Sequence, residues 1–204
     1  RSMRAIKKAT RLTVQEIIGK LSAMAQPDYR RGKVEKYDIA LQEIQHELTA
    51  VHKFVEKIQE NTMEASSQYI SVLHALDHLE RMNHLALQAT MRTDGPLHDQ
   101  SENAYPIILE LLGNMLACID AIDEKKLEEF LPTIRQFSQE LAAFRKEQRA
   151  NVFDVTAKGE ISVPQAFHYV QLILFVDGLA YHLWRIIHHL TAEEQQNNSE
   201  KKLS

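Results

Sequence analysis

The sequence is poor in the residues that form turns and cross-links. Its 204 residues include 6 glycines, 5 prolines and one cysteine, Cys118. So few turn-forming residues argue against a protein of many short strands and favour long helices with few connections. A single cysteine excludes an intrachain disulfide, so the fold must depend on packing, as in proteins of a reducing compartment.

Charge and hydropathy argue against two further classes of protein. The formal net charge is -4 and no basic stripe with interleaved aromatic residues is present, which argues against nucleic-acid binding. No uninterrupted apolar run reaches the roughly 18 residues that a membrane-spanning helix requires. The best candidate, residues 170–184, is broken by Gln171, Asp177 and His182.

The motifs of common enzyme classes are missing as well. There is no glycine-rich phosphate loop, and no serine or cysteine stands in a nucleophile elbow. The Glu-x-x-His motif that di-iron bundles carry on two helices occurs once, at residues 43–46. Cys118 lies within an apolar helical stripe and is expected in the core. We therefore expect no catalytic activity.

What the chain does contain is a sustained helical pattern. Apolar residues recur every three or four positions, and the pattern is interrupted at Pro27, at 94–96, at Asp123-Glu124 and Pro132, and at 158–159. We expect six helices, at about residues 3–25, 33–60, 62–90, 101–123, 133–155 and 163–194.

Two stretches rich in titratable residues, 74–86 and 179–189, are related by a constant offset. Four residues of the first stretch are repeated 104 positions later, as His78 with His182, Leu79 with Leu183, Arg81 with Arg185 and His84 with His188. The turn at Pro27 is matched near Pro132 at almost the same offset. We therefore interpret the chain as an internal repeat of two three-helix units.

The repeat predicts an all-α fold made of a tandem pair of antiparallel three-helix bundles, related by a pseudo-twofold axis. The expected units are residues 1–98 and 99–194, with the two motif helices near the axis. Whether the six helices form two separate bundles or one continuous bundle is left open. The tail at 195–204 is polar and without apolar period, and is expected to be disordered.

One face of the third helix carries groups that can ligate a metal. At about 100° per residue, Asp77, Glu80, Arg81 and His84 lie on the same side, and His188 occupies a corresponding place on the last helix. Glu80 and His84 are four residues apart and can reach one ion of zinc, iron, nickel or manganese. The same residues also fit an ordinary surface lattice of ion pairs, such as Asp77 with Arg81.

The stretch Leu76–His84 resembles the Asp-Leu-Glu-Arg-Ile-Gly-Asp motif of PhoU-like phosphate regulators, which are tandem three-helix bundles carrying it once per repeat. Residues 34–41 resemble the family's Glu-x-x-Ile-Asp-x-Leu segment, and residues 145–162 follow the family's order. The chain is most similar to the cytoplasmic PhoU-like domain at the C-terminus of bacterial sodium/phosphate cotransporters. The start at Arg1-Ser2-Met3, unlike a natural start, fits such an excised domain.

The resemblance implies a non-catalytic regulatory domain for sodium-dependent transport of inorganic phosphate. It implies a place at the cytoplasmic face of the inner membrane. The partner would be a membrane transporter domain, in the same chain or as a separate subunit. Alternatives are a free-standing PhoU-like adaptor that represses phosphate uptake or signalling, a metal-dependent or metal-storing bundle, and a homodimeric scaffold.

The resemblance also bears on the metal. In the family, the motif's Glu and Asp help to bind clusters of iron, zinc or nickel. Here Glu80 keeps its place, His78 and His84 replace the two Asp residues, and Trp184 stands where the second motif has its Glu. A cluster is thereby put in doubt, and the predicted site is one for a single ion, with the candidate ligands Asp77, Glu80, His84 and His188.

Overall fold

The computed structural model describes residues 2–24, 31–61, 67–92 and 104–203, and almost all of them are helical. The helices are α1 (Ser2–Met24), α2 (Arg31–Asn61), α3 (Ser67–Arg92), α4 (Ala104–Asp123), α5 (Leu127–Ala157) and α6 (Val163–Leu203). These ranges contain six helices and no strand, so the expected all-α fold is confirmed. Several expected boundaries lie outside the described residues, namely Pro27, the segment 94–96 and the division of the chain at residue 98.

The break expected at Asp123-Glu124 is confirmed, whereas the one expected at Pro132 is wrong. α5 begins at Leu127 and continues through the proline, and the chain turns instead at residues 124–126. Lys125 adopts a left-handed conformation there, with φ of 60°, and the N–H of Lys126 donates to the carbonyl of Ala121 at 2.8 Å. Pro132 is tolerated because it lies in the second helical turn, where its missing N–H removes one backbone hydrogen bond near the helix start.

The connection between α5 and α6 follows the local signals in the sequence. Gly159 adopts a φ of 74°, which favours glycine, and the N–H of Glu160 donates to the carbonyl of Val155 at 3.0 Å. The Ser162 N–H and hydroxyl both donate to Oε1 of Gln165, at 2.9 and 2.8 Å. This reciprocal cap begins α6 at the expected place. At its other end α6 continues to Leu203, through most of the polar segment that we expected to be disordered.

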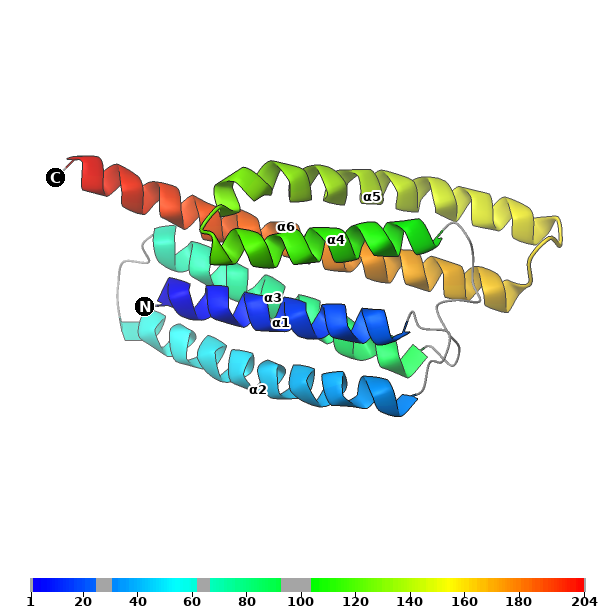
Figure 1. The fold of residues 1–204 in the computed structure, drawn as a ribbon, viewed down its shortest axis with the longest axis horizontal. Helices are drawn as coiled ribbons and strands as arrows, with labels where there is room; N and C mark the ends of the chain where they lie inside the picture. Colours follow the sequence, from blue (N-terminus) through cyan, green and yellow to red (C-terminus); the bar gives the residue numbers. More distant parts are fainter. Residues whose placement is uncertain (1, 25–30, 62–66, 93–103, 204) are drawn as a thin grey trace.

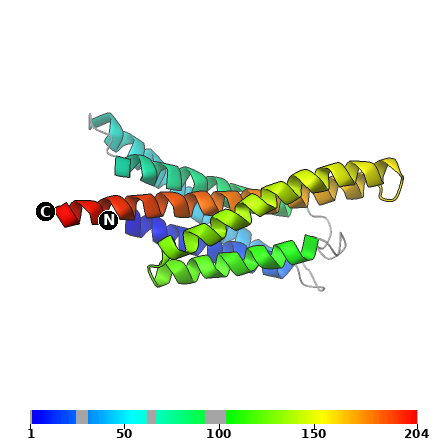
Figure 2. The same ribbon diagram turned by 90° about the horizontal axis from the view of Figure 1, so that it is seen from above.

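The helices form two groups of three that lie side by side (Figure 1). α1, α2 and α3 contact one another, and so do α4, α5 and α6. The groups are joined chiefly by α3 against α6 and by α1 against α4. The third and sixth helices thus hold equivalent places at the junction of the two halves, as the repeat predicts. The hairpin of α5 and α6 extends beyond the other helices at one end of the molecule (Figure 2).

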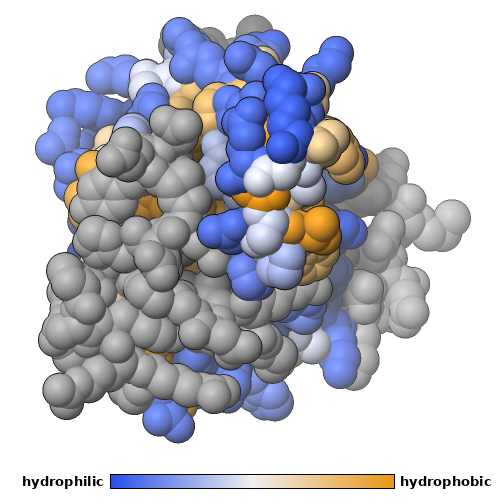
Figure 3. Space-filling model, turned by 90° about the vertical axis from the view of Figure 1, so that its right-hand side faces the viewer, coloured by the Kyte–Doolittle hydropathy of each residue, from blue (hydrophilic) through white to orange (hydrophobic). Residues whose placement is uncertain are grey.

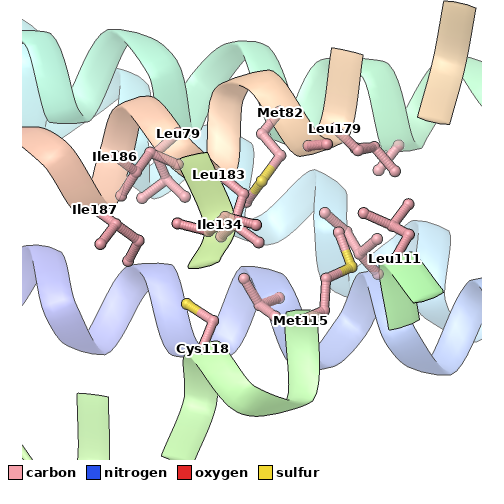
Figure 4. Packing of buried hydrophobic residues seen from close by; sticks show 14 of the residues in the cluster. Leu79, Met82, Leu111, Met115, Cys118, Ile134, Leu179, Leu183, Ile186 and Ile187 are labelled. Atoms are coloured by element: carbon pink, nitrogen blue, oxygen red, sulfur yellow. The ribbon is translucent and has the colours of Figure 1, made fainter. Parts of the chain in front are cut away.

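A single hydrophobic core runs through all six helices. Side chains from α3, α4, α5 and α6 meet at the junction of the two halves, and Figure 4 labels Leu79, Met82, Leu111, Met115, Cys118, Ile134, Leu179, Leu183, Ile186 and Ile187. The same cluster includes Ile17 of α1 and Leu41 of α2. The two groups therefore share one core, which answers the question that the sequence left open.

The lone cysteine belongs to this core. Cys118 is fully buried, and burial raises the pKa of its thiol to about 12. A thiol with such a pKa stays protonated at neutral pH and cannot act as a nucleophile. The expectation of a core cysteine is confirmed.

One helix among the described residues is long and apolar enough to cross a membrane. The segment is Val163–Thr191 of α6. By length and composition alone this is weak evidence, because the central helix of a helical bundle can meet the same criteria. α6 packs along α3 and α5, and its buried face supplies much of the core.

The shared core predicts that a substitution in α3 weakens the whole bundle. Leu79 is fully buried at the junction with α6. Replacing it with Ala should lower the free energy of unfolding by about 2–5 kcal/mol, because a cavity is left in a packed core. Urea denaturation followed by circular dichroism measures the loss. The matched control is Leu109→Ala on α4, where the side chain is 50% exposed and the loss should be about 0.5 kcal/mol or less. Equal losses for the two variants would contradict the shared core.

Candidate functional site at the junction of α3 and α6

A pair of histidines lies where the two motif helices cross. Nδ1 of His78 on α3 is 3.0 Å from Nδ1 of His182 on α6. The two residues are 104 positions apart and are equivalent in the repeat. Two equivalent atoms of a twofold repeat can touch only close to the axis, so this contact marks the pseudo-twofold axis of the molecule.

Arg185 fixes the protonation of the neighbouring rings. Its Nε donates to Nε2 of His78 at 3.4 Å, and its terminal nitrogen lies 3.2 Å from Nε2 of His189. A guanidinium has only donors, so both Nε2 atoms must act as acceptors and both rings must be neutral. His78 then carries its proton on Nδ1 and donates it to Nδ1 of His182.

Four rings form a cluster, which we call the histidine cluster: His74, His78, His182 and His189, with His189 stacked on both His74 and His78. The centroids of His74 and His189 are 5.0 Å apart and those of His78 and His182 are 5.2 Å apart. His189 is buried, His78 and His182 are half-buried, and His74 is exposed. Two of the rings come from each motif helix, so the cluster depends on the packing of the halves.

Burial keeps His78, His182 and His189 neutral, and Arg185 acts in the same direction on His78 and His189. Burial, followed by the repulsion that a charged His78 ring would exert, lowers the pKa of His182 to about 4. Burial and then Arg185 lower the pKa of His189 to about 4, and the same two causes lower the pKa of His78. These lowered pKa values agree with the hydrogen bonds, in which the neutral rings of His78 and His189 accept from N–H groups of Arg185.

Aromatic side chains border the cluster on α6. The ring of Tyr181 packs edge-on against His78, with centroids 5.8 Å apart, and also against Trp184. The Arg185 guanidinium lies 5.4 Å from the centre of the Trp184 ring, a cation–π contact that helps to hold it in place. Arg185 therefore has three ring partners, two imidazoles and one indole.

The four predicted metal ligands have separate partners. Asp77 accepts from Nε of Arg81 at 3.0 Å, as the surface lattice predicted. Glu80 lies 2.9 Å from Nδ1 of His52 on α2, and His84 lies 2.8 Å from Gln88. His188 packs against Trp184 and His189.

No three of these donors converge. Within the described residues, no group of three or more His, Cys, Asp or Glu side chains is arranged to hold a metal ion. The side chains as they stand do not fit one shared ion. We derive no chemistry through a metal, and the metal site stays a prediction.

Several polar contacts were not expected from the sequence. His52 belongs to none of the motifs singled out in the sequence, yet it pairs with Glu80 across α2 and α3. Lys20 is fully buried and pairs with Asp38 at 2.8 Å. Asn83 is also buried and donates to the carbonyl of Leu41 at 2.9 Å. Helical periodicity predicts which face of a helix is buried. It does not predict which polar residues will be buried on that face.

These internal polar residues join the helices of the first half. Lys20 of α1 donates to the backbone carbonyl of Ala86 on α3 and pairs with Asp38 on α2. Burial lowers the pKa of Lys20, and the hydrogen bond to Asp38 opposes that shift. A buried ammonium needs such partners, so the position of α1 between α2 and α3 is tightly specified.

Comparison with known proteins gives a likeness of fold. No family model matches the sequence, and no curated protein matches it either. Among solved structures, the chain is similar to the phosphate transport system regulatory protein PhoU from Streptococcus pneumoniae, with a TM-score of 0.63 and 16% identity. The match covers 94% of each chain. The fold of the chain is therefore PhoU-like.

The lowered pKa values predict an acid-sensitive fold. Below about pH 6.5 the unfolded chain protonates its histidines, whereas folded His182 and His189 stay neutral down to about pH 4. The stability that these neutral histidines contribute should therefore be fully present above pH 6.5, and the free energy of unfolding should fall as the pH drops toward 4. The slope is at most about 1.4 kcal/mol per pH unit for each histidine, reduced by solvent screening at this half-exposed site.

Urea denaturation at several pH values between 4 and 7.5 measures this slope. His182→Gln should make the slope shallower. The matched control is His46→Gln on the exposed face of α2, which should leave it unchanged. A slope that is the same in all three proteins would contradict the assignment of neutral rings.

Proposed function

We propose that this chain is a non-catalytic regulatory domain that controls the transport of inorganic phosphate from the cytoplasmic side of a membrane. The observation that carries the proposal is the match to the PhoU fold over 94% of both chains. The motif resemblance at Leu76–His84 supports it independently, because that motif lies in α3, at the junction of the halves. A regulator of this kind acts through contacts between helices, and the described residues offer a large helical surface for them.

The finer proposal is that the transporter is a sodium-dependent phosphate cotransporter, with this domain attached to it or bound as a separate subunit. The resemblance to the C-terminal domains of such cotransporters supports it. The whole-chain match to PhoU itself favours a second candidate, a free-standing adaptor that represses phosphate uptake or signalling. The first candidate requires that the regulated phosphate uptake depends on sodium, and the second candidate does not.

The chemistry of the site supports a non-catalytic role. Arg185 is held by two imidazoles and an indole, so its neighbours fix its position between the two motif helices. Cys118 is buried with a raised pKa and cannot act as a nucleophile. Such a centre is suited to holding two helices in one arrangement.

Phosphate uptake in the organism that encodes the chain tests the proposal. Deleting the coding segment should change the rate of uptake of radiolabelled phosphate or its response to phosphate supply, and expression of the chain from a plasmid should restore it. Replacing sodium in the medium with choline separates the candidates. If the part of the uptake that the deletion alters disappears in choline medium, the cotransporter is supported. If that part is still present in choline medium, the adaptor is supported. Uptake unaltered by the deletion in both media would contradict both.

Metal binding is proposed as an option to be measured separately. Glu80 with His84 is the pair that the sequence favours, although their present partners are His52 and Gln88. If they bind zinc, iron or nickel, protein purified without chelator should carry close to one equivalent by elemental analysis. Glu80→Ala with His84→Ala should abolish it. The control is Glu110→Ala with His46→Ala, two exposed positions on other helices. Less than a tenth of an equivalent in the unmodified protein would exclude the site.

A further inference from the structure

The end of the α5–α6 hairpin has an unusual surface. It extends past the other helices in both ribbon views (Figures 1 and 2). Val163, Phe153 and Phe167 are 71%, 70% and 59% exposed, which makes them the most exposed large hydrophobic side chains among the described residues. Figure 3 looks at this end and shows hydrophobic residues gathered between hydrophilic ones. Exposed apolar side chains that gather on a projecting surface are typical of an interaction site.

The inner side of the hairpin is already filled. Val152 of α5 packs with Ala166, Tyr169 and Ile173 of α6 in a small cluster of its own. The hydroxyl of Tyr169 also donates to Oε1 of Gln148 at 3.0 Å. The exposed phenylalanines are therefore not the inner face of an incomplete hairpin.

The outer side carries an apolar stripe along α6. Val163, Phe167, Val170, Leu174 and Tyr181 follow one another at steps of four, three, four and seven residues, which places them on one side of the helix. All but Val170 are exposed. This stripe explains why Val163–Thr191 is apolar enough to cross a membrane although only 44% of its most apolar stretch is buried in the bundle. Both faces of the helix are apolar, and the bundle covers one of them.

The neighbouring face of α5 is basic. Arg145, Arg149 and Phe153 are spaced four residues apart on one side of the helix, and Lys146 lies beside them. Arg145 forms an ion pair with Asp177, which stands between Leu174 and Tyr181 on α6. That contact joins the two stripes into one surface, which we call the hairpin face: Lys146, Arg149, Phe153, Val163, Phe167, Val170, Leu174 and Tyr181.

Acidic residues are absent from the hairpin face. Between residues 145 and 181 the chain has four acidic side chains, and Asp177 is neutralised by Arg145. Glu147 and Asp154 lie roughly 80–100° around α5 from Lys146, and Asp154 is paired with Lys158 at 2.6 Å. Glu160 lies in the turn between the helices. Lys146 and Arg149 form no ion pair with any described residue, so a positive, apolar face stands on a chain of net charge -4.

We propose that the hairpin face binds the surface of an anionic lipid bilayer. Phe153 and Phe167 enter the boundary between headgroups and acyl chains, while Lys146 and Arg149 contact the anionic headgroups. Aromatic side chains beside lysine and arginine, without acidic residues, are the composition of interfacial helices. Charge complementarity favours lipid over a second copy of this chain, since two such faces would bring like charges together. This inference goes beyond the proposed regulatory role and does not depend on it.

Sedimentation of the purified protein with vesicles tests the proposal. The protein should pellet with vesicles of equimolar phosphatidylcholine and phosphatidylglycerol, and much less with phosphatidylcholine alone. Added salt should weaken the binding. Lys146→Ala with Arg149→Ala should weaken it about thirtyfold, the effect of removing two basic contacts at an anionic surface. Phe153→Ser with Phe167→Ser should weaken it at least about tenfold.

Matched controls distinguish binding through the hairpin face from nonspecific binding through basic or apolar side chains elsewhere on the protein. Arg4→Ala with Lys8→Ala removes one arginine and one lysine from an exposed position on α1. Leu109→Ser with Leu116→Ser removes two half-exposed leucines from α4. Both variants should bind like the unmodified protein. Circular dichroism checks that each variant folds.

A fluorescent probe tests whether the tip enters the lipid. In a protein carrying Phe167→Trp and Trp184→Phe, the emission should shift to shorter wavelength with anionic vesicles and should be quenched by brominated acyl chains. No sedimentation with anionic vesicles, or equal binding by the hairpin and control variants, would overturn the proposal. So would light scattering that shows a dimer lost only in the phenylalanine variant, which would assign this face to a second copy of the chain.

Discussion

The packing of α3 against α6 is the contact on which the rest of the structure depends. Each of these helices also packs against the other two of its own half, so their junction ties both halves to one core. Leu79 and Leu183, equivalent in the repeat, are both fully buried there. Because the two helices are related by a pseudo-twofold axis, any residue at that axis must meet its own equivalent. The residue at the crossing must therefore be one that can contact a second residue of the same kind without repulsion.

Histidine meets this requirement as long as it is neutral. One ring donates and the other accepts, which is how His78 and His182 lie at 3.0 Å. Two carboxylates at that distance would repel each other, and two charged rings would as well. Arg185 supplies donors that favour the neutral form, and burial acts in the same direction. The junction is thereby sensitive to acid even though no catalytic chemistry is carried out there.

The halves share a fold but not their internal polar contacts. Lys20 and Asp38 lock α1 between α2 and α3, whereas the position 104 residues after Lys20 is Glu124, in an exposed turn. Arg145 and Asp177 join α5 to α6, while the position 104 residues before Asp177 is Leu73. A second difference is the apolar outer face of α6, beside the basic stripe of α5. Such asymmetries are where the two halves of a repeat can acquire separate tasks.

Periodicity and turn residues in the sequence determined the helical class, the six segments, the internal repeat and the core cysteine. Those features depend on local spacing, and local spacing is visible in the chain. Only the tertiary structure decided that His52 meets Glu80, that Lys20 is buried, and that the candidate metal ligands point to different partners. Such contacts join residues far apart in the chain, and their geometry depends on helix rotation, which an apolar stripe defines only coarsely. Pro132 illustrates the same limit, because a proline's effect depends on its place within a helix that the packing extends.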